Sequence, residues 1–506
     1  MNKTPKITLS MIVKNEEKNL RECFESIKDV VDEIVLVDTG STDKTINIAE
    51  EFDAKVYQYK WANDFSSARN FALSKSTGKW ILYLDADEKL SEKSIAELNK
   101  VTENNNLIGC RCIVNNLDEH NGKPNYMRYT RLFRNNSKIK FSGAVHEQID
   151  NSLLENGYEI INTEVEIIHT GYNLSGEELR HKAQRNLAIL KKEYEKSNTA
   201  YGAFQIANTY SLLKDYETAY KYYSSAVGKD DLNNEFKAHA YLNLSDYEFK
   251  KHNIARAIEF LETGLNIDSS NALLNLLACD IYFRINLREK ALEYCKKALK
   301  ENKKIMAANN ESTFAVRLEP DLIISKGIYC SLLSSNNSNL NFFMDVLRKE
   351  NSKVAFYIDK FIQSQSFSSN EKKEIIKIVK PDNLDVFLFC IENYNDKKTA
   401  LEILLSLKNQ FKNNSKYLKT LGLLFFENKF YDEAVNEYEE SLLLKEKDPA
   451  SVFYLVSALV ESNQIEKIPD LLLFAEKEFG NIPEFNDAFE SLKQKLNKLF
   501  SVKTFQ

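Results

Sequence analysis

The segment that most constrains the fold is a short apolar run, Trp80 to Leu84, that ends in two carboxylates, Asp85 and Asp87. The run is too short for a buried helix and has the length of a buried strand. In an open α/β sheet, ligands bind at the carboxyl ends of the strands, where both carboxylates can reach one divalent cation. The structural alternative is a strand followed by a helix that Asp87 or Ser91 caps.

Three further strands are expected upstream, with helical stretches between them: Ile7 to Val13, Glu33 to Asp38 and Lys55 to Tyr59. This alternation predicts a parallel sheet with right-handed crossovers, so the strand ends near Asn15, Asp38 and Asp85 should meet at one edge. The glycine-rich motif GxGxxG and the P-loop are both absent, which disfavours a dinucleotide oxidoreductase and a P-loop ATPase. The pattern favours a nucleotide site built on carboxylates and a metal.

Three motifs give residues 7–91 a family resemblance: Lys14-Asn15-Glu16-Glu17, the turn from Asp38 to Thr45, and Asp85-Ala86-Asp87. In this order and spacing they resemble the family 2 glycosyltransferases of the GT-A fold, a Rossmann-like α/β fold with a mixed sheet. The resemblance implies that Asp87 ligates Mn²⁺ or Mg²⁺ and that a UDP-sugar is the donor. It also implies a set of nucleotide-sugar-binding residues: Asn15, Glu16, Asp38, Gly40, Ser41, Asp64, Arg69 and Asp85.

The expected chemistry explains why such a site needs positive charge. Breaking a sugar–diphosphate bond leaves negative charge on the departing phosphate, so a cation there stabilises the transition state. Arg69 lies in the segment from Asp64 to Asn70 and is a candidate for a second positive charge. Its alternative is a solvated helix arginine.

After a helix from Ser91 to Thr102, four strands are expected: Leu107 to Val114, Tyr126 to Phe133, Ile139 to Ile149 and Glu164 to Ile168. They would form the acceptor half of a GT-A domain. The runs Arg131 to Asn135 and Lys138 to Glu147 are similar to a bacterial subgroup of family 2, as are Trp61 to Asn70 and His169 to Tyr172. That subgroup includes the S-glycosyltransferases of sublancin-type bacteriocins and certain lipopolysaccharide-core glucosyltransferases.

An inverting transfer needs a base to accept the proton of the acceptor. Glu147 is the first choice, and His146 is a structural or acceptor-binding alternative, because neighbours on a strand point to opposite faces. His169, at the end of a predicted strand, is a candidate to complete the metal shell with Asp87; otherwise it is a turn residue. Arg131 and Arg134 either bind phosphate or face solvent.

From Glu177 onward the chain is expected to be helical, with small residues recurring at spacings of 12 and 7, as in Ala207, Ala219 and Ala226. A period of 34 residues, as from Ala257 to Ala291, resembles the tetratricopeptide repeat (TPR). The expected division is a GT-A domain (1–175), a linking helix (176–200) and an all-α TPR-like solenoid (201–506), degenerate at about 300–390. Such a solenoid captures an extended polypeptide, or it serves as a dimerisation arm.

Charge, cysteine content and the length of apolar runs exclude several kinds of protein. The net charge of −6 argues against a nucleic-acid surface or a polybasic membrane anchor. Seven scattered cysteines, an odd number without a zinc-type pair, favour a reducing cytosol. No run approaches the ~20 apolar residues that span a bilayer, and the first 16 residues have too short an apolar run for a signal peptide.

Together these features predict a cytoplasmic, metal-dependent transferase that moves a hexose from a UDP-sugar to a Cys, Ser or Thr side chain of a peptide or protein, with inversion. A homodimer is compatible with the repeats. Two alternatives stay open: a transferase of surface polysaccharide or lipopolysaccharide assembly, and a TPR scaffold with an inactive transferase domain. Intact Asp38, Asp85 and Asp87 argue against the scaffold.

Overall fold

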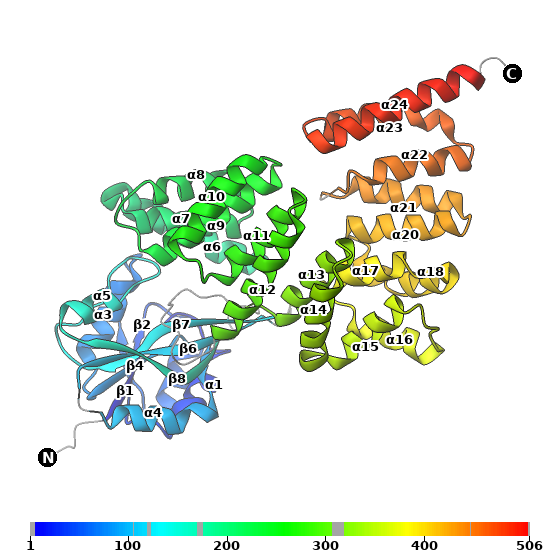
Figure 1. The fold of residues 1–506 in the computed structure, drawn as a ribbon. Helices are drawn as coiled ribbons and strands as arrows, with labels where there is room; N and C mark the ends of the chain where they lie inside the picture. The colour runs from blue at the N-terminus through cyan, green and yellow to red at the C-terminus, as the bar shows by residue number, and fades with distance from the viewer. Residues whose placement is uncertain are drawn as a thin grey trace. The chain divides into compact units, whose positions relative to one another are not determined.

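The computed structural model describes residues 6–104, 106–118, 123–169, 176–305, 318–445 and 447–503. The chain divides into two compact units, Met1–Glu319 and Pro320–Gln506. The first unit contains an α/β domain followed by helices, and the second is helical (Figure 1).

One mixed sheet of eight strands, in the order β3-β2-β1-β4-β7-β6-β8-β5, organises the α/β domain. The strands are β1 (Ile7–Val13), β2 (Glu33–Asp38), β3 (Lys55–Gln58), β4 (Trp80–Tyr83), β5 (Glu88–Leu90), β6 (Ile108–Asp118), β7 (Lys123–Arg134) and β8 (Glu159–His169). The first four strands are parallel, as the alternation with helices predicted. Strand β7 joins β4 in the antiparallel sense, which makes the sheet mixed.

Helices cover both faces of this sheet (Figure 1). They are α1 (Leu20–Ile27), α2 (Thr45–Glu51), α3 (Phe65–Lys75), α4 (Ile95–Thr102) and α5 (Asp150–Glu155), with a 3₁₀ turn at Glu92–Ser94. Strand β4 shows how the two cores form: Trp80 and Leu82 pack with α1 and α4, whereas Ile81 and Tyr83 pack with α5. Alternating side chains of a strand point to opposite faces, so a strand buried on both sides is apolar throughout.

The strand predicted from Ile139 to Ile149 is wrong. This segment is irregular apart from one bridge between Ser142 and Gln148, and the backbone turns at Gly143 (φ 97°) and His146 (φ 54°). Its apolar residues are buried in two different clusters rather than on one face of a strand. Apolar and polar residues alternate in this loop as they do in a half-buried strand, and the sequence analysis therefore predicted a strand. The sequence analysis also missed β5, a three-residue strand too short to leave a pattern, whereas the helix predicted from Ser91 to Thr102 corresponds to the 3₁₀ turn and α4.

Seven helices complete the described part of the first unit. They are α6 (Gly176–Ser197), α7 (Ala200–Leu212), α8 (Tyr216–Val227), α9 (Asn234–Lys250), α10 (Ile254–Ile267), α11 (Ala272–Arg284) and α12 (Arg288–Lys304). Helices α7 and α8, α9 and α10, and α11 and α12 pack as successive pairs. Ala207, Ala219 and Ala226 are buried, so the small residues of the predicted ladder do lie in the helix–helix packing.

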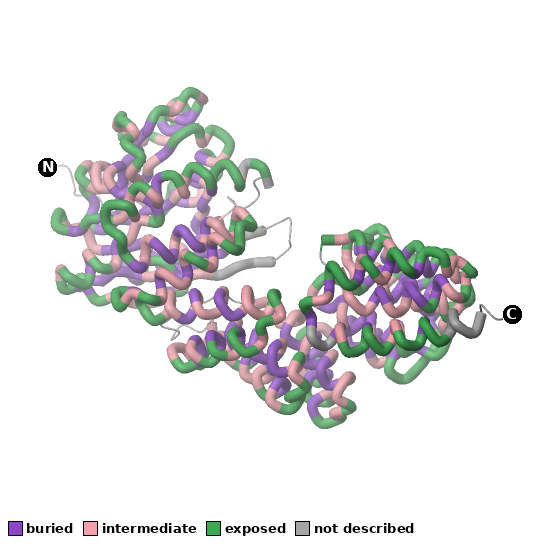
Figure 2. The backbone as a smooth tube through the Cα atoms, turned by 90° about the horizontal axis from the view of Figure 1, so that it is seen from above, coloured by how far each residue is buried: buried purple, intermediate pink, exposed green. Residues whose placement is uncertain are grey.

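In the described part of the second unit, residues 320–445 and 447–503, the regular elements are all helices. Its helices are α13 (Pro320–Leu333), α14 (Asn337–Glu350), α15 (Ser352–Ile362), α16 (Ser369–Ile378), α17 (Leu384–Glu392), α18 (Lys397–Ser406), α19 (Lys408–Phe411), α20 (Ser415–Glu427), α21 (Tyr431–Leu443), α22 (Ser451–Glu461), α23 (Ile468–Phe479) and α24 (Pro483–Lys503), with a 3₁₀ turn at Ile465–Lys467. Buried and exposed residues alternate along these helices (Figure 2), as the packing of amphipathic helices requires. Within the described ranges, no helix is long and apolar enough to span a membrane.

Candidate active site at the carboxyl edge of the sheet

The loops after β1 and β2 interlock at the carboxyl edge of the sheet. The side-chain oxygen of Asn15 accepts a hydrogen bond from the Thr42 amide (2.8 Å), and the Asn15 amide donates to Ser41 Oγ (2.9 Å). The buried Asp38 carboxylate accepts the amides of Gly40 (3.1 Å) and Ser41 (3.1 Å). The structure thus brings the first two motifs together as predicted, and their side chains hold the two loops in shape.

Glu16 connects this corner to the end of β4. Its amide donates to Thr45 Oγ1 at 2.7 Å, which anchors it to the start of α2. Burial raises the pKa of Glu16, against a hydrogen bond from Asn19, and the nearby charges of Asp87 and Asp85 raise it further. The three motifs therefore lie within electrostatic reach of one another.

Asp64 has a structural contact that the sequence did not assign to it. It caps α3, with its carboxylate accepting the Ser67 amide at 3.0 Å and the Ser66 hydroxyl at 2.8 Å. Although burial opposes them, these hydrogen bonds lower the pKa of Asp64. An ionised cap at a helix N-terminus also interacts favourably with the helix dipole.

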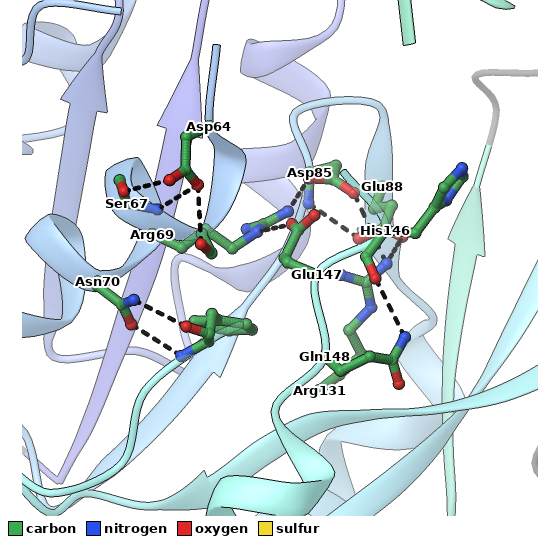
Figure 3. A network of polar contacts seen from close by, with 12 residues as sticks. Asp64, Ser67, Arg69, Asn70, Asp85, Glu88, Arg131, His146, Glu147 and Gln148 are labelled. Atoms are coloured by element: carbon green, nitrogen blue, oxygen red, sulfur yellow. Dashed lines mark hydrogen bonds and ion pairs between the residues drawn. The ribbon is translucent and has the colours of Figure 1, made fainter. Parts of the chain in front are cut away.

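Arg69 of α3 joins two acidic residues from different parts of the chain (Figure 3). Its Nη2 lies 2.6 Å from Asp85 Oδ1, and its Nε donates to Glu147. The side chain is only 6% exposed and stacks over Tyr83, with 5.1 Å from the guanidinium carbon to the ring centroid. A solvated helix arginine is therefore excluded. Despite the loss of hydration, Arg69, with help from Arg131, holds the pKa of Asp85 well below its usual range.

A second ion pair, which the sequence analysis missed, lies on the other side of Asp85. Arg131 of β7 contacts the buried Glu88 (2.6 Å) and lies 3.6 Å from Asp85 Oδ2. Glu88 also accepts the Asp85 amide at 2.9 Å. Burial raises the pKa of Glu88 to about 7, although Arg131 opposes the shift. The acidic run after β4 was the only feature of the sequence that pointed to this ion pair, because Arg131 is 43 residues away from Glu88. Arg134, by contrast, stacks over Trp80.

Asp87 and His169 meet as predicted. Strand β5 pairs with β8 and aligns Glu88 with His169, which brings His169 Nε2 to 3.3 Å from Asp87 Oδ2. His169 Nδ1 lies 2.7 Å from the side-chain oxygen of Asn116. Burial lowers the pKa of His169, but the hydrogen bond and charge of Asp87 outweigh it, and the net shift is upward. Residues 170–172, which with His169 carried part of the resemblance, lie outside the described part of the chain.

Asp87 and His169 are the candidate ligands for a divalent cation at this corner. In the described part of the chain, no group of three or more His, Cys, Asp or Glu side chains is arranged to hold a metal by itself. Two candidate side chains are compatible with a cation bound through substrate phosphates, since such a cation needs only one or two ligands from the protein.

His146 and Glu147 lie on an irregular loop, yet they do point in different directions (Figure 3). His146 is exposed and has a left-handed backbone conformation, φ 54°. Glu147 points to Arg69, and its side chain is 14% exposed. The predicted separation of the two side chains holds, but it arises from a turn instead of from strand geometry. Of the pair, Glu147 is the one that joins the polar network at the end of β4.

Comparisons with known proteins agree with this geometry. Residues 8–157 match the model of glycosyl transferase family 2, and residues 200–228 match a tetratricopeptide repeat. The SPbeta prophage-derived glycosyltransferase SunS of Bacillus subtilis is 35% identical over 192 residues, covering 37% of this chain and 45% of that protein. A TPR repeat-containing protein of Synechococcus elongatus is 42% identical over 148 residues, covering 29% of this chain and 36% of that protein.

The chain spans less than half the length of these curated relatives. Among solved structures, TarS of S. aureus has a TM-score of 0.28 and 14% identity over 67% of this chain and 54% of that one. Glucosyl-3-phosphoglycerate synthase of Mycobacterium tuberculosis, solved with Mn²⁺ and UDP, has a TM-score of 0.20 and 19% identity over 22% of this chain and 43% of that one.

Proposed function

We propose that this chain, which carries a family 2 glycosyltransferase domain and a tetratricopeptide repeat, moves a hexose from a UDP-sugar to a peptide or protein side chain with inversion. One observation carries the proposal. Arg69 links Asp85, beside the candidate cation ligand Asp87, to Glu147 on a separate loop. One guanidinium group therefore contacts both Asp85, on the donor side, and Glu147, the candidate base.

The donor would lie across the interlocked loops at the carboxyl edge of the sheet. Asn15, Glu16 and Asp38, with Gly40 and Ser41, line the end where base and ribose would bind. Asp87 and His169 would hold Mn²⁺ or Mg²⁺, which when bound offsets the charge of the diphosphate leaving group. Arg69 and Arg131 keep Asp85 ionised next to these ligands, so its negative charge also favours the cation.

Glu147 would accept the proton of the acceptor nucleophile. The hydrogen bond from Arg69 orients its carboxylate, and a general base must be positioned in this way to take up a proton from the acceptor. Inversion requires attack on the sugar carbon from the side opposite the leaving group, with the base on the acceptor side. If the nucleophile is a cysteine thiol, little base strength is needed, because a thiol pKa is ~8.5.

The preference for a polypeptide acceptor rests on the helical array that follows the transferase domain within the same compact unit. Stacked helix pairs present extended surfaces suited to peptides. The array is also suited to joining two copies of the chain, so the acceptor needs a direct test.

Mass spectrometry provides that test. The protein is incubated with Mn²⁺, a panel of UDP-, GDP- and dTDP-sugars and host peptides, beside the variant Asp87→Asn and the control Asp29→Asn, an exposed aspartate on the loop after α1. We expect a hexose added to a Cys, Ser or Thr of a peptide by the wild type and the control, and loss of at least 100-fold in Asp87→Asn, since the cation offsets leaving-group charge. Donor hydrolysis without peptide modification would refute the peptide acceptor and favour a glycan acceptor. No turnover with any donor would refute the transferase, and normal turnover of Asp87→Asn would refute the metal assignment.

A further inference from the structure

The loop that carries Glu147, residues Gly143–Gln148, has little structure of its own. Its only ladder contact among the described residues is the bridge between Ser142 and Gln148. The backbone is left-handed at Gly143 and again at His146, a conformation that is uncommon for a residue with a side chain. Such a conformation persists where the surroundings over-determine it. The question is which contacts hold this loop.

Helices α6 and α7 supply polar contacts to the loop. Glu193 of α6 accepts the Ala144 amide at 3.1 Å. The Tyr201 hydroxyl of α7 accepts from Gln148 Nε2 at 3.0 Å and donates to the His146 carbonyl oxygen at 3.5 Å. Burial raises the pKa of Tyr201 to about 12, against its hydrogen bonds. Tyr201 therefore stays a neutral phenol, able both to donate and to accept, over the pH range in which an enzyme works.

The same helices bury the loop's apolar residue. Val145 is 5% exposed and packs with Ile189 and Leu190 of α6 and Ile206 of α7. Trp61, which precedes α3, packs against this cluster. Residues 144, 145, 146 and 148 are thus each tied to α6 or α7, and Glu147 alone turns to the ion-pair network.

The opposite side of the loop contacts α3. The Ala144 carbonyl oxygen accepts the Phe65 amide at 2.9 Å. Asn70 brackets the backbone of Phe141 with hydrogen bonds of 2.8 and 2.9 Å. The loop is therefore clamped between the helix that bears Arg69 and the first helices of the array. Through Glu147 and Arg69, the position of the loop is linked to Asp85.

We infer that α6 and α7 are a working part of the active site, with Tyr201 as a positioning residue that holds Glu147 in place for proton transfer. The inference rests on the proposed function and adds a role for the array that is separate from acceptor capture. Cutting the chain between α6 and α7 would remove Tyr201 and release the loop, so loss of transfer after such a cut would not by itself identify an acceptor site.

The test compares Tyr201→Phe in the full chain with Tyr216→Phe, the same chemical change at an exposed position of α8. Removing the hydroxyl leaves Gln148 Nε2 without one acceptor and the His146 carbonyl without one donor. We expect kcat to fall roughly tenfold when these two hydrogen bonds are lost, because the loop then no longer holds Glu147 in one position. The KM for the donor should stay within about twofold, because the donor contacts lie on other loops. Tyr216→Phe should match the wild type.

Two further measurements test this contact independently of Tyr201→Phe. Gln148→Ala removes the contact from the loop side, together with the 3.2 Å hydrogen bond from Gln148 Nε2 to the His146 carbonyl oxygen. It should lower kcat at least as much, and it tests the role of the contact if Tyr201→Phe fails to fold. Acrylamide quenching of tryptophan fluorescence reports on the loop without any activity: Trp80 is fully buried, so added quenching reports Trp61. We expect quenching to increase in Tyr201→Phe and in Gln148→Ala, but not in Tyr216→Phe.

The outcomes separate the two proposals. If the wild type transfers sugar and Tyr201→Phe and Gln148→Ala match it in kcat, the positioning role is refuted and the proposed function stands. A rise in donor KM with kcat unchanged would also refute it, because loop position would then affect binding instead of proton transfer. If the wild type transfers no sugar, the proposed function fails; the positioning of Glu147 for catalysis fails with it, and quenching then decides only whether α7 holds the loop.

Discussion

Replacing Arg69 by methionine tests the ion-pair network directly. Arg69 lies between Asp85 and Glu147, and its side chain is 6% exposed. Methionine has similar length and fills much of the space, but it leaves two carboxylates facing each other without the guanidinium. The variant therefore isolates the electrostatic contribution of Arg69 from its packing against Tyr83 and Phe141.

The expected loss follows from the burial of the partners. Removing one member of a buried ion pair costs about 3–5 kcal/mol, because the remaining charge is uncompensated. Glu147 is 14% exposed and contributes fully, whereas Asp85 is 40% exposed and keeps Arg131 nearby, so solvent screening reduces its share. We therefore expect Arg69→Met to lower the free energy of unfolding of the α/β domain by about 3 kcal/mol.

Urea denaturation monitored by tryptophan fluorescence measures the change, because Trp80 is buried in this domain and donates to the Thr102 carbonyl at 3.0 Å. The double variant Arg69→Met/Glu147→Gln removes one stranded charge and should recover about 1–2 kcal/mol relative to the sum of the single variants. Arg69→Lys keeps the charge without the two-armed geometry and should lie between wild type and Arg69→Met. A loss under 1 kcal/mol in Arg69→Met, or strict additivity in the double variant, would refute the argument.

Two further predictions concern the helical parts. Gly422→Ala should destabilise the second unit by about 1–2 kcal/mol in urea unfolding: a Cβ at this position would lie 2.6 Å from the Tyr438 ring, and overpacking of about 1–3 kcal/mol outweighs the helix propensity of about 1 kcal/mol that alanine gains. A more stable variant would contradict this. Burial lowers the pKa of His239 from 6.5 to about 4, so the unfolded chain binds more protons and stability is lost as the pH falls from 6.5 towards 4. The melting temperature should fall less between pH 7 and pH 4.5 in His239→Gln than in the wild type, and an equal fall would contradict the assignment.

The sequence was sufficient wherever a feature depends on a local period. Leu20, Cys23, Phe24 and Ile27 have helical spacing, and all four are buried on one face of α1. The acidic ends of β2 and β4 also lie where predicted, because parallel strands place their carboxyl ends at one edge. The buried small residues of α7 and α8 followed from their spacing in the same way.

Only the tertiary structure decided which ion pairs form at that edge. Arg69 finds Glu147 across 78 residues, and Arg131 finds Glu88 across 43, with no period to signal either pair. The loop around Glu147 has an alternating pattern that indicated a strand, yet helices α6 and α7 hold it in a turn. A period of 2 or 3.6 residues in the apolar positions shows how a segment buries its own apolar side chains. The partners of charged residues lie on other segments that folding brings close. The chemistry of this site therefore follows from the packing of the whole unit.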